Sequence, residues 1–393
     1  MSVLKGVASW GTAAPDRRRR AIPFVIAVVF ALLYPFIDQA IGLRYIDPMV
    51  SILILVLLAL GLNIVVGIAG LLDLGYAAFF AIGAYTAAFL TSPVSPLPYR
   101  TNFWIAMAIS FFVAMIFGVI LGIPVLRLRG DYLAIVTLGF GEIVPRIFLN
   151  LDSITGGSKG INPIGKPSIF GYTLDASNPI GWYYLVIGVG ILSIFLINRM
   201  LDSRLGRSWM ALREDEIAAA SNGINIMGTK LLAFAMGASF SGFAGSIFAA
   251  RFQFIDPFRF DFTISVMVLA MVILGGLGNT YGVIIGGIIM ASYDRFLAER
   301  LTGWLHAIGN STGIEVLTRI DLLNSRLFIF GAALILTMLL RPEGLFPSRR
   351  RAAELHAGEE EPEVFDGGTV LEQERQTLYD VEVAQEPTGE HGT

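Results

Sequence analysis

Long apolar runs alternate with short polar connections from residue 21 to residue 341. About 20 residues of helix are needed to cross ~30 Å of hydrocarbon, and ten runs reach or approach this length. They lie at residues 21–37, 46–71, 75–91, 102–126, 131–150, 181–199, 228–251, 263–278, 282–297 and 325–341. The pattern predicts an all-α integral membrane protein, a polytopic bundle of about ten transmembrane helices.

Two of the runs contain glycine-rich interruptions. Residues 46–72 would form a continuous helix ~40 Å long, which exceeds the membrane core. Backbone that is unpaired at membrane depth costs several kcal/mol per group unless protein or water satisfies it, so such breaks tend to line cavities. Close helix packing explains the glycines equally well. The candidate pathway residues in these runs are Asn63, Gly67, Gly70, Gly275, Gly276 and Gly278.

Composition supports a membrane protein and excludes several kinds of site. The chain has 393 residues, of which 55% are hydrophobic and 15% charged, with 43 glycines and a mean hydropathy of +0.69. These values exclude an ordinary soluble domain. Cysteine is absent, and two of the three histidines lie beyond Arg351. We therefore expect no disulfide, no metal site and no catalytic group within the membrane.

Basic residues orient the predicted spans. Arginines gather near residues 17–20, 127–129, 199–213 and 349–351, and the positive-inside rule assigns these connections to the cytoplasm. With ten crossings, both termini are then cytoplasmic. The predicted organisation is a basic amino terminus (1–20), a transmembrane domain (21–347) and an acidic disordered tail (348–393). The transmembrane domain includes an external loop (151–180), a cytoplasmic loop (200–227) and an external interfacial segment (298–324).

One acidic side chain lies near the middle of a predicted span. Glu142 is about 11 residues into the run 131–150, and an ionisable group at that depth indicates function by default. Arg146 follows four residues later and can neutralise it, which we favour over substrate contact. Glu142 is nevertheless retained as a candidate pathway residue. Asp73, at the inner end of the second span, fits the cap of the next helix equally well.

Residues 160–167 read GINPIGKP and approach the phosphate-binding loop pattern G-x-x-x-x-G-K-[ST]. Pro167 stands where that loop requires Ser or Thr to hold magnesium, and no predicted strand precedes the segment. Its predicted position is also external. The sequence therefore predicts no nucleotide site in this chain, and any ATP that drives it must be bound by another chain.

A charged segment, GRSWMALREDEIAAASNGIN at residues 206–225, interrupts the apolar pattern. Leu205, Trp209 and Leu212 form an apolar stripe at helical spacing beside charged faces. Small side chains follow, and Gly223 can supply the left-handed cap that ends a helix. Such a helix fits a partner's groove better than a membrane interface. The candidate docking residues are Gly206, Arg207, Trp209, Arg213, Glu214, Asp215, Glu216, Ala218, Ala219 and Gly223.

At these residues the chain resembles the permeases of ATP-binding-cassette importers, specifically the LivM type of branched-chain amino acid uptake systems. The general signature is Glu-Ala-Ala, three residues, then Gly. Ala218, Ala219 and Gly223 fit it, Ile217 replaces the Glu, and Glu216 stands one place early. The likeness extends to NIVVGIAGLLDLGYAAFFAIGAY, RGDYLAIVTLGFGEI, TGGSKGI, AMVILGGLGNTYGVIIGG and LLRPEGLFPSRRR, and covers most of residues 46–351 in the expected order.

The resemblance implies a multi-pass subunit of the bacterial inner membrane that imports leucine, isoleucine or valine. Its implied partners are a LivH-like permease, two cytoplasmic LivG/LivF-like ATPases that carry ATP and magnesium, and a periplasmic binding protein. This chain would hold no cofactor, would not be an enzyme, and would contact membrane lipid but no nucleic acid. Residues 206–223 would transmit the ATPase motion. The loop residues that would face the binding protein are Thr155, Gly156, Gly157 and Ser158.

Other interpretations stay open at this point. Related permeases serve urea, short amides or other amino acids, so the substrate is less secure than the class. A secondary transporter or channel working alone would need a coupling-ion site or a charged pore. Glu142 and Asp73 supply too few charged groups for either. A membrane enzyme is disfavoured by the scarcity of histidine.

Overall fold

The computed structural model describes residues 17–346, except 43–44, 129, 170, 176, 314–315, 317–318, 320, 323 and 342–343. The described residues belong to one compact unit, residues 1–347. The first 16 residues and the acidic tail lie outside the described residues, so what the sequence predicts for them stays a prediction.

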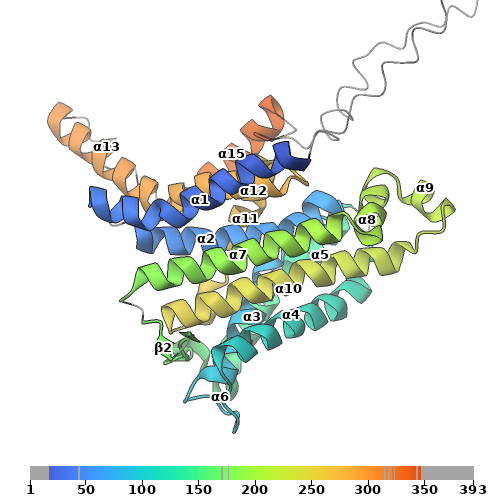
Figure 1. Cartoon of the computed structure of the whole chain (residues 1–393), viewed down its shortest axis with the longest axis horizontal. Coiled ribbons are helices and arrows are strands. Elements are labelled where there is room, and N and C mark those ends of the chain that lie inside the picture. The colour runs from blue at the N-terminus through green and yellow to red at the C-terminus, as the bar shows by residue number, and fades with distance from the viewer. Residues whose placement is uncertain are drawn as a thin grey trace, which may run out of the picture. The chain divides into compact units, whose positions relative to one another are not determined.

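The described chain is mainly helical (Figure 1). In chain order the helices are α1 (Arg17–Ile41), α2 (Ile46–Leu62), η3 (Asn63–Ile68), α3 (Tyr76–Thr91), α4 (Phe103–Val125), α5 (Asp131–Asn150), α6 (Asp152–Thr155), η4 (Gly157–Lys159), α7 (Pro179–Leu201), α8 (Arg204–Glu214), α9 (Glu216–Ser221), α10 (Ile226–Phe252), η5 (Pro257–Arg259), α11 (Phe262–Gly275), α12 (Thr280–Ser292), η6 (Tyr293–Leu297), α13 (Ala298–Thr312) and α15 (Arg326–Leu340). Strands β1 (Ser168–Ile169) and β2 (Tyr172–Thr173) form a short antiparallel hairpin.

The predicted spans correspond to observed helices. Within the described residues, seven helical stretches are long and apolar enough to cross a membrane, and three shorter apolar helices accompany them. Each of these helices overlaps one of the apolar runs found in the sequence. The polytopic helical fold is therefore confirmed.

Helix α10 forms the centre of the bundle, where it packs against α2, α3 and α4 (Figure 1). Its many Gly, Ala and Ser residues permit the close backbone approach that stabilises helix pairs in membranes. A Cβ at Gly83 of α3 would lie 2.5 Å from the Cα of Gly242 in α10, and one at Gly245 would overlap the carbonyl oxygen of Phe80. Helices α3 and α10 therefore touch through their backbones.

Both glycine-rich runs are broken, as the sequence predicts. Helix α2 passes into the π-helix η3, after which residues 69–75 leave the helical conformation and Gly70 takes a φ of +71°. Helix α11 ends at Gly275, and Gly276 and Gly278 take φ values of +113° and +81° before α12 begins. A Cβ disfavours positive φ, so glycine is the residue that suits these turns.

The two ends of the bundle carry different connections. At one end, α8 and α9 join α7 to α10 (Figure 1). Helix α10 has 27 residues and is therefore about 40 Å long. The chain turns into α11 at its other end. The loop at residues 151–178 packs at this second end, where the N–H of Ile161 donates to the carbonyl oxygen of Ile255 over 2.9 Å. Helices α8 and α9 and this loop thus lie at opposite ends of α10.

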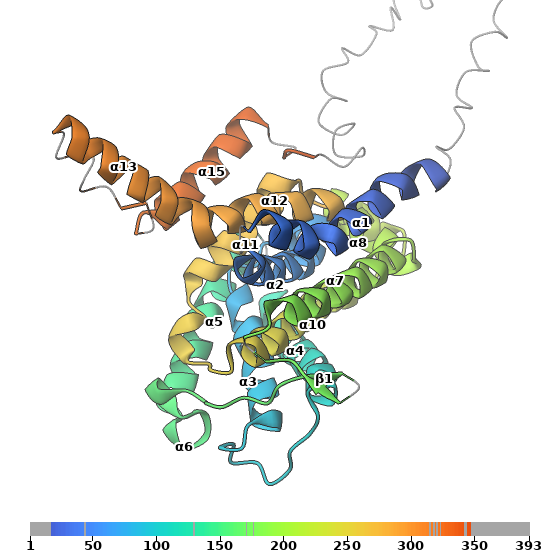
Figure 2. The same ribbon diagram turned by 60° about the vertical axis from the view of Figure 1, so that its left-hand side comes forward.

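The segment predicted to be interfacial continues the preceding helix. Residues Thr280–Ser311 form one helical stretch through α12, η6 and α13, so the helix does not end at residue 297, where the apolar run ends. Glu299 and Arg300 interrupt the hydropathy but are good helix formers. Figure 2 shows α13 and α15 extending away from the rest of the bundle.

Candidate functional site

The charged segment forms two helices, α8 and α9, separated at Asp215. The Oδ1 atom of Asp215 accepts hydrogen bonds from the N–H groups of Ile217 (2.7 Å) and Ala218 (3.1 Å), so Asp215 caps α9. The segment ends at Gly223, which has a φ of +79° and donates its N–H to the carbonyl oxygen of Ala220 over 2.9 Å. The left-handed glycine cap is therefore present, and the break at Asp215 is an addition to the prediction.

Two buried side chains fix this segment to α10. Trp209 is buried, and its Nε1 donates to the carbonyl oxygen of Thr229 over 2.9 Å. Lys230 of α10 is buried too and forms an ion pair with Glu216 at the start of α9. The Lys230 side chain is 5% exposed and the Glu216 side chain 32% exposed, so the contact joins the buried face of α10 to the start of α9. Helix α9 is therefore joined to α10 by a direct ion pair.

The predicted apolar stripe of α8 is only partly correct. Trp209 and Leu212 are buried, whereas Leu205 is 43% exposed. Leu205 lies in the first turn, where α8 has just left the end of α7. Gly206 permits that sharp approach, because a Cβ there would overlap the carbonyl oxygen of Leu201. Of the remaining predicted residues on α8, Arg207 donates from Nη1 to the carbonyl oxygen of Asp202 (3.1 Å) and Glu214 is exposed.

The surface of α9 also differs from the prediction. Ala219 is only 3% exposed, so it packs inside this chain and is not available to a partner's groove. The side chains exposed on α9 include Ile217, at 74%, with Ala218 and Ala220 beside it. Helical spacing placed the small residues correctly, but only the packing of α9 on its neighbours decides which of them face outward.

Arg213 joins α8 to both broken spans. Its Nη1 donates to the carbonyl oxygen of Gly67 over 2.6 Å, and a Cβ at Gly70 would lie 2.8 Å from the Cγ of Arg213. The same Nη1 lies 3.3 Å from the position of a Cβ at Gly278. One docking residue therefore contacts three of the candidate pathway glycines.

The two breaks also contact each other. The Oδ1 of Asn63 accepts a hydrogen bond from the N–H of Gly278 over 3.0 Å, between residues 215 positions apart. A Cβ at Gly67 would overlap that Oδ1 and lie 2.5 Å from the nitrogen of Gly278. We call the cluster of Asn63, Gly67, Gly70, Arg213 and Gly278 the break junction. Its glycines permit this close contact between the two spans, in agreement with the packing explanation. The pathway role of these residues stays a prediction.

Residues 344–346 pack against the second break. The N–H of Leu345 donates to the carbonyl oxygen of Leu274 over 2.9 Å, and a Cβ at Gly344 would lie 2.5 Å from the Cα of Gly276. Gly275 faces α12, where a Cβ would overlap a carbonyl oxygen. Sequence reasoning gave this segment no role. No local pattern names the element against which it packs.

Two buried polar atoms beside the junction have no hydrogen-bond partner among the described residues. They are the Nδ2 of Asn63 and the Oδ2 of Asp73. The other carboxylate oxygen of Asp73 accepts from the N–H of Gly75 over 2.9 Å, next to the start of α3, as the capping interpretation expects. Since native proteins leave few buried polar atoms unpaired, these two atoms are unused hydrogen-bonding groups next to the first break.

Glu142 pairs with a residue of its own helix. It forms an ion pair of 3.4 Å with Arg146, and the two side chains are 41% and 74% exposed. The structure thus favours the neutralisation by Arg146 that the spacing suggests. Its neighbour Gly141 does approach the first break, since a Cβ there would lie 2.9 Å from the Cα of Gly75.

The loop assigned to a binding protein is held by its own contacts. Thr155 is buried and donates from Oγ1 to the carbonyl oxygen of Leu151 over 2.9 Å. Gly156 and Gly157 take φ values of +75° and +54°, and only Ser158 of the four candidates is exposed. Three of the four residues therefore shape this loop, and a role of Ser158 in contacting a binding protein stays a prediction.

The near-match to a phosphate-binding loop lacks the required context. Residues 160–167 lead into the two-residue strand β1 instead of a helix, and Lys166 forms an ion pair with Asp175. A phosphate-binding loop needs a helix amino terminus directed at the phosphates. These residues therefore belong to the loop at residues 151–178.

Comparisons with known proteins agree with this architecture. The family model described as "Branched-chain amino acid transport system / permease component" matches residues 45–338. The high-affinity branched-chain amino acid transport system permease protein LivM of Escherichia coli is 40% identical over 357 residues, which cover 85% of this chain and 77% of that protein. LivM of Salmonella typhimurium is 39% identical over 86% of this chain and 77% of its own length.

A second type of permease is more distantly similar. LivH of Escherichia coli is 25% identical over 261 residues, which cover 63% of this chain and 82% of that protein. No solved structure matches the chain significantly. The matched region runs from α2 to α15 and contains both broken spans and the α8–α9 segment. This chain therefore belongs to the family of permease components of branched-chain amino acid transport systems.

Proposed function

We propose that this chain is the transmembrane permease subunit of an ATP-driven importer for branched-chain amino acids. It forms half of the translocation pathway, beside a LivH-like permease, in the bacterial inner membrane with both termini in the cytoplasm. Two LivG/LivF-like ATPases carry ATP and magnesium, and a periplasmic binding protein delivers leucine, isoleucine or valine. The chain itself is a transporter subunit and performs no catalysis.

The break junction is the observation that carries this proposal. Arg213 contacts Gly67 directly and lies against Gly70 and Gly278, so α8 is connected to both interrupted spans. Docking of an ATPase on α8 and α9 would therefore act on the two places where the membrane helices are broken. A stand-alone transporter has no need for an exposed pair of short helices linked in this way.

The exposed face of α5 supports a second permease. Glu142 and Arg146 lie in the middle and second half of a 20-residue helix, yet both are exposed in this chain. Ile135, Ile143 and Ile147 are exposed on the same helix. An ion pair facing lipid at that depth would be expensive, whereas a partner helix can cover it. We therefore assign this face of α5 to the LivH-like subunit.

Reconstitution tests the proposal. The chain is purified with its permease and ATPase partners, placed in liposomes, and supplied with binding protein and radiolabelled leucine. Uptake should require ATP and the intact Walker lysine of the partner ATPase. Equal leucine uptake by liposomes that contain this chain without any ATPase would contradict the proposal in favour of a secondary transporter or channel.

A further inference from the structure

A mixed-charge pocket lies at the end of the bundle opposite α8 and α9. Its volume is about 260 Å³, just below the ~300–1,000 Å³ typical of drug-sized ligands, which suits a small molecule. Phe252, the last residue of α10, lines it, whereas the first residues of α10 adjoin α9. The pocket and the docking segment are thus separated by the length of α10, about 40 Å. Nothing in the sequence pattern pointed to this pocket, because its walls come from six separated segments.

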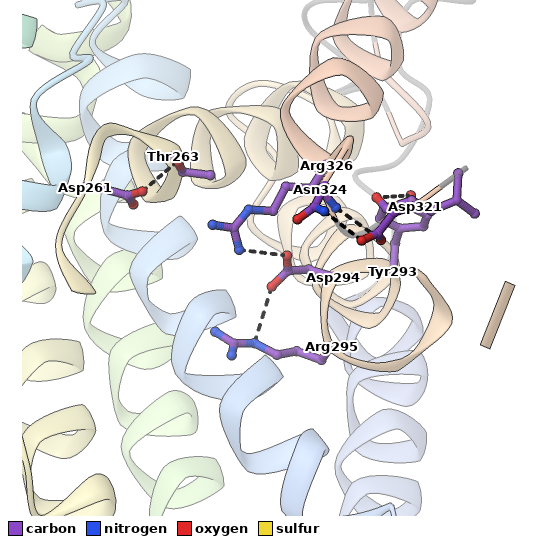
Figure 3. A network of polar contacts seen from close by, with 9 residues as sticks. Asp261, Thr263, Tyr293, Asp294, Arg295, Asp321, Asn324 and Arg326 are labelled. Carbon is purple, nitrogen blue, oxygen red and sulfur yellow. Dashed lines mark hydrogen bonds and ion pairs between the residues drawn. The ribbon is translucent and has the colours of Figure 1, made fainter. Parts of the chain in front are cut away.

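Five charged side chains, three arginines and two aspartates, line the pocket. These are Arg259, Asp261, Asp294, Arg295 and Arg326. Asp294 lies between two guanidinium groups, with its Oδ2 3.5 Å from Nε of Arg295 and its Oδ1 3.9 Å from Nη1 of Arg326 (Figure 3). Both distances exceed the ~2.7–2.9 Å of a charge-assisted hydrogen bond, so most of the five N–H donors of each arginine can serve a ligand.

Asp294 positions these arginines and is itself well buried, with an 8% exposed side chain. One carboxylate between two guanidinium groups leaves an excess positive charge, which favours a second anion. In Figure 3 the guanidinium groups of Arg295 and Arg326 extend toward the side on which Asp261 and Thr263 lie. Arg295 and Asp294 belong to the π-helix η6, a geometry that often occurs at functional sites.

The opposite side of the pocket offers a negative group and aromatic faces. The Oδ2 of Asp261 accepts a hydrogen bond from the hydroxyl of Thr263 over 2.8 Å, which orients the carboxylate. Phe252 and Phe258 line the same pocket, and both are partly or largely exposed. The guanidinium of Arg259 already lies over the Phe252 ring, 5.7 Å from its centroid, so the Asp261 carboxylate and the Phe258 ring are the groups suited to an ammonium group. Deeper in the pocket the walls are apolar, formed by Leu55, Phe80, Phe248, Met267 and Ile264.

We propose that this pocket binds the transported amino acid as a zwitterion. The α-carboxylate is held by Arg295 and Arg326, the α-ammonium by Asp261, and the aliphatic side chain by the apolar floor around Leu55 and Phe80. The proposal rests on the proposed function for the nature of the ligand. It adds a substrate site within this chain, between the binding protein and the break junction. Leu55 lies eight residues before Asn63 on α2, so the floor of the pocket is ~12 Å along the helix from that junction.

Direct binding tests the site without transport. The chain is purified with its permease and ATPase partners in nanodiscs, without binding protein, and equilibrium binding of radiolabelled L-leucine is measured. Binding should saturate. Arg295→Gln or Arg326→Gln should weaken it about ten- to hundredfold, because each removes charged hydrogen bonds to the carboxylate. The leucine affinity of Arg326→Lys should lie between that of wild type and that of Arg326→Gln. Arg100 is an exposed arginine of another external loop, so Arg100→Gln should bind leucine as tightly as wild type.

Leucine analogues separate the two arms of the zwitterion. Leucine methyl ester lacks the anion and 4-methylpentanoate lacks the ammonium, and each should compete at least tenfold more weakly than leucine. Asp261→Asn leaves the arginine cluster intact and should weaken leucine binding without changing 4-methylpentanoate binding. If 4-methylpentanoate competed as well as leucine and Asp261→Asn had no effect, the pocket would be an anion site and the zwitterion proposal would be wrong.

Uptake by the same wild-type preparation in liposomes separates this proposal from the function on which it rests. ATP-driven leucine uptake without saturable leucine binding would overturn the pocket assignment alone. Absence of uptake would overturn the proposed function, while the binding data would still decide the pocket. Co-purified phosphatidylethanolamine that is lost in Arg326→Gln, together with no leucine binding, would assign the pocket to a lipid headgroup and overturn the substrate site.

Discussion

Replacing Arg213 with glutamine should uncouple the ATPases from the broken spans. The change removes a guanidinium that donates to the carbonyl oxygen of Gly67 over 2.6 Å and packs against Gly70. A hydrogen bond from a charged donor contributes ~1.5–3 kcal/mol. Since 1.4 kcal/mol corresponds to a factor of ten, leucine uptake should fall about ten- to hundredfold. Arg213→Lys keeps the positive charge but loses the planar guanidinium, so its leucine uptake should lie between those of wild type and Arg213→Gln.

The assay measures uptake and ATP hydrolysis in the same proteoliposomes. Hydrolysis should continue in Arg213→Gln, because the exposed surface of α9 is unchanged, while the leucine transported per ATP falls. Arg204→Gln, in the first turn of the same helix and exposed, is the matched control and should retain the wild-type ratio. An unchanged ratio of uptake to hydrolysis in Arg213→Gln, with the complex correctly assembled, would refute the role of this arginine in coupling.

Three further predictions follow from the same contacts. Gly67→Ala should destabilise the break junction by ~1–3 kcal/mol and reduce leucine uptake, because the new Cβ overlaps Asn63. Gly188→Ala is the control and should change neither stability nor uptake, because its Cβ meets open space. Equal thermal stability and equal uptake in the two variants would contradict the importance of the junction. Ala220→Trp should reduce co-purification of the ATPases through the exposed face of α9, whereas Ala219→Trp should lower the stability of the permease itself, because Ala219 is buried. Full retention of ATPase in Ala220→Trp would exclude that face as the contact. The isolated chain should bind no ATP in a fluorescent nucleotide assay, and saturable binding lost in Lys166→Ala would overturn this expectation.

The local features of the chain follow from the sequence because they depend on neighbouring residues. Apolar length fixed the spans, since every backbone group within a membrane must be satisfied inside a helix. Gly223 ends α9 with a positive φ, and Gly70 and Gly276 mark the breaks, because these turns disfavour a Cβ. The family resemblance likewise rests on short contiguous motifs, and the comparisons confirm it.

Only the tertiary structure decided which of these features meet. The hydrogen bond between Asn63 and Gly278 joins residues 215 positions apart, and no local pattern encodes that pairing. Burial of Ala219 likewise depends on how α9 packs, which helical periodicity cannot resolve in a helix of six residues. The proposed substrate pocket is the clearest case. Arg259, Arg295 and Arg326 come from three elements, and each alone resembles an ordinary surface charge, so their chemistry arises only where the fold brings them together.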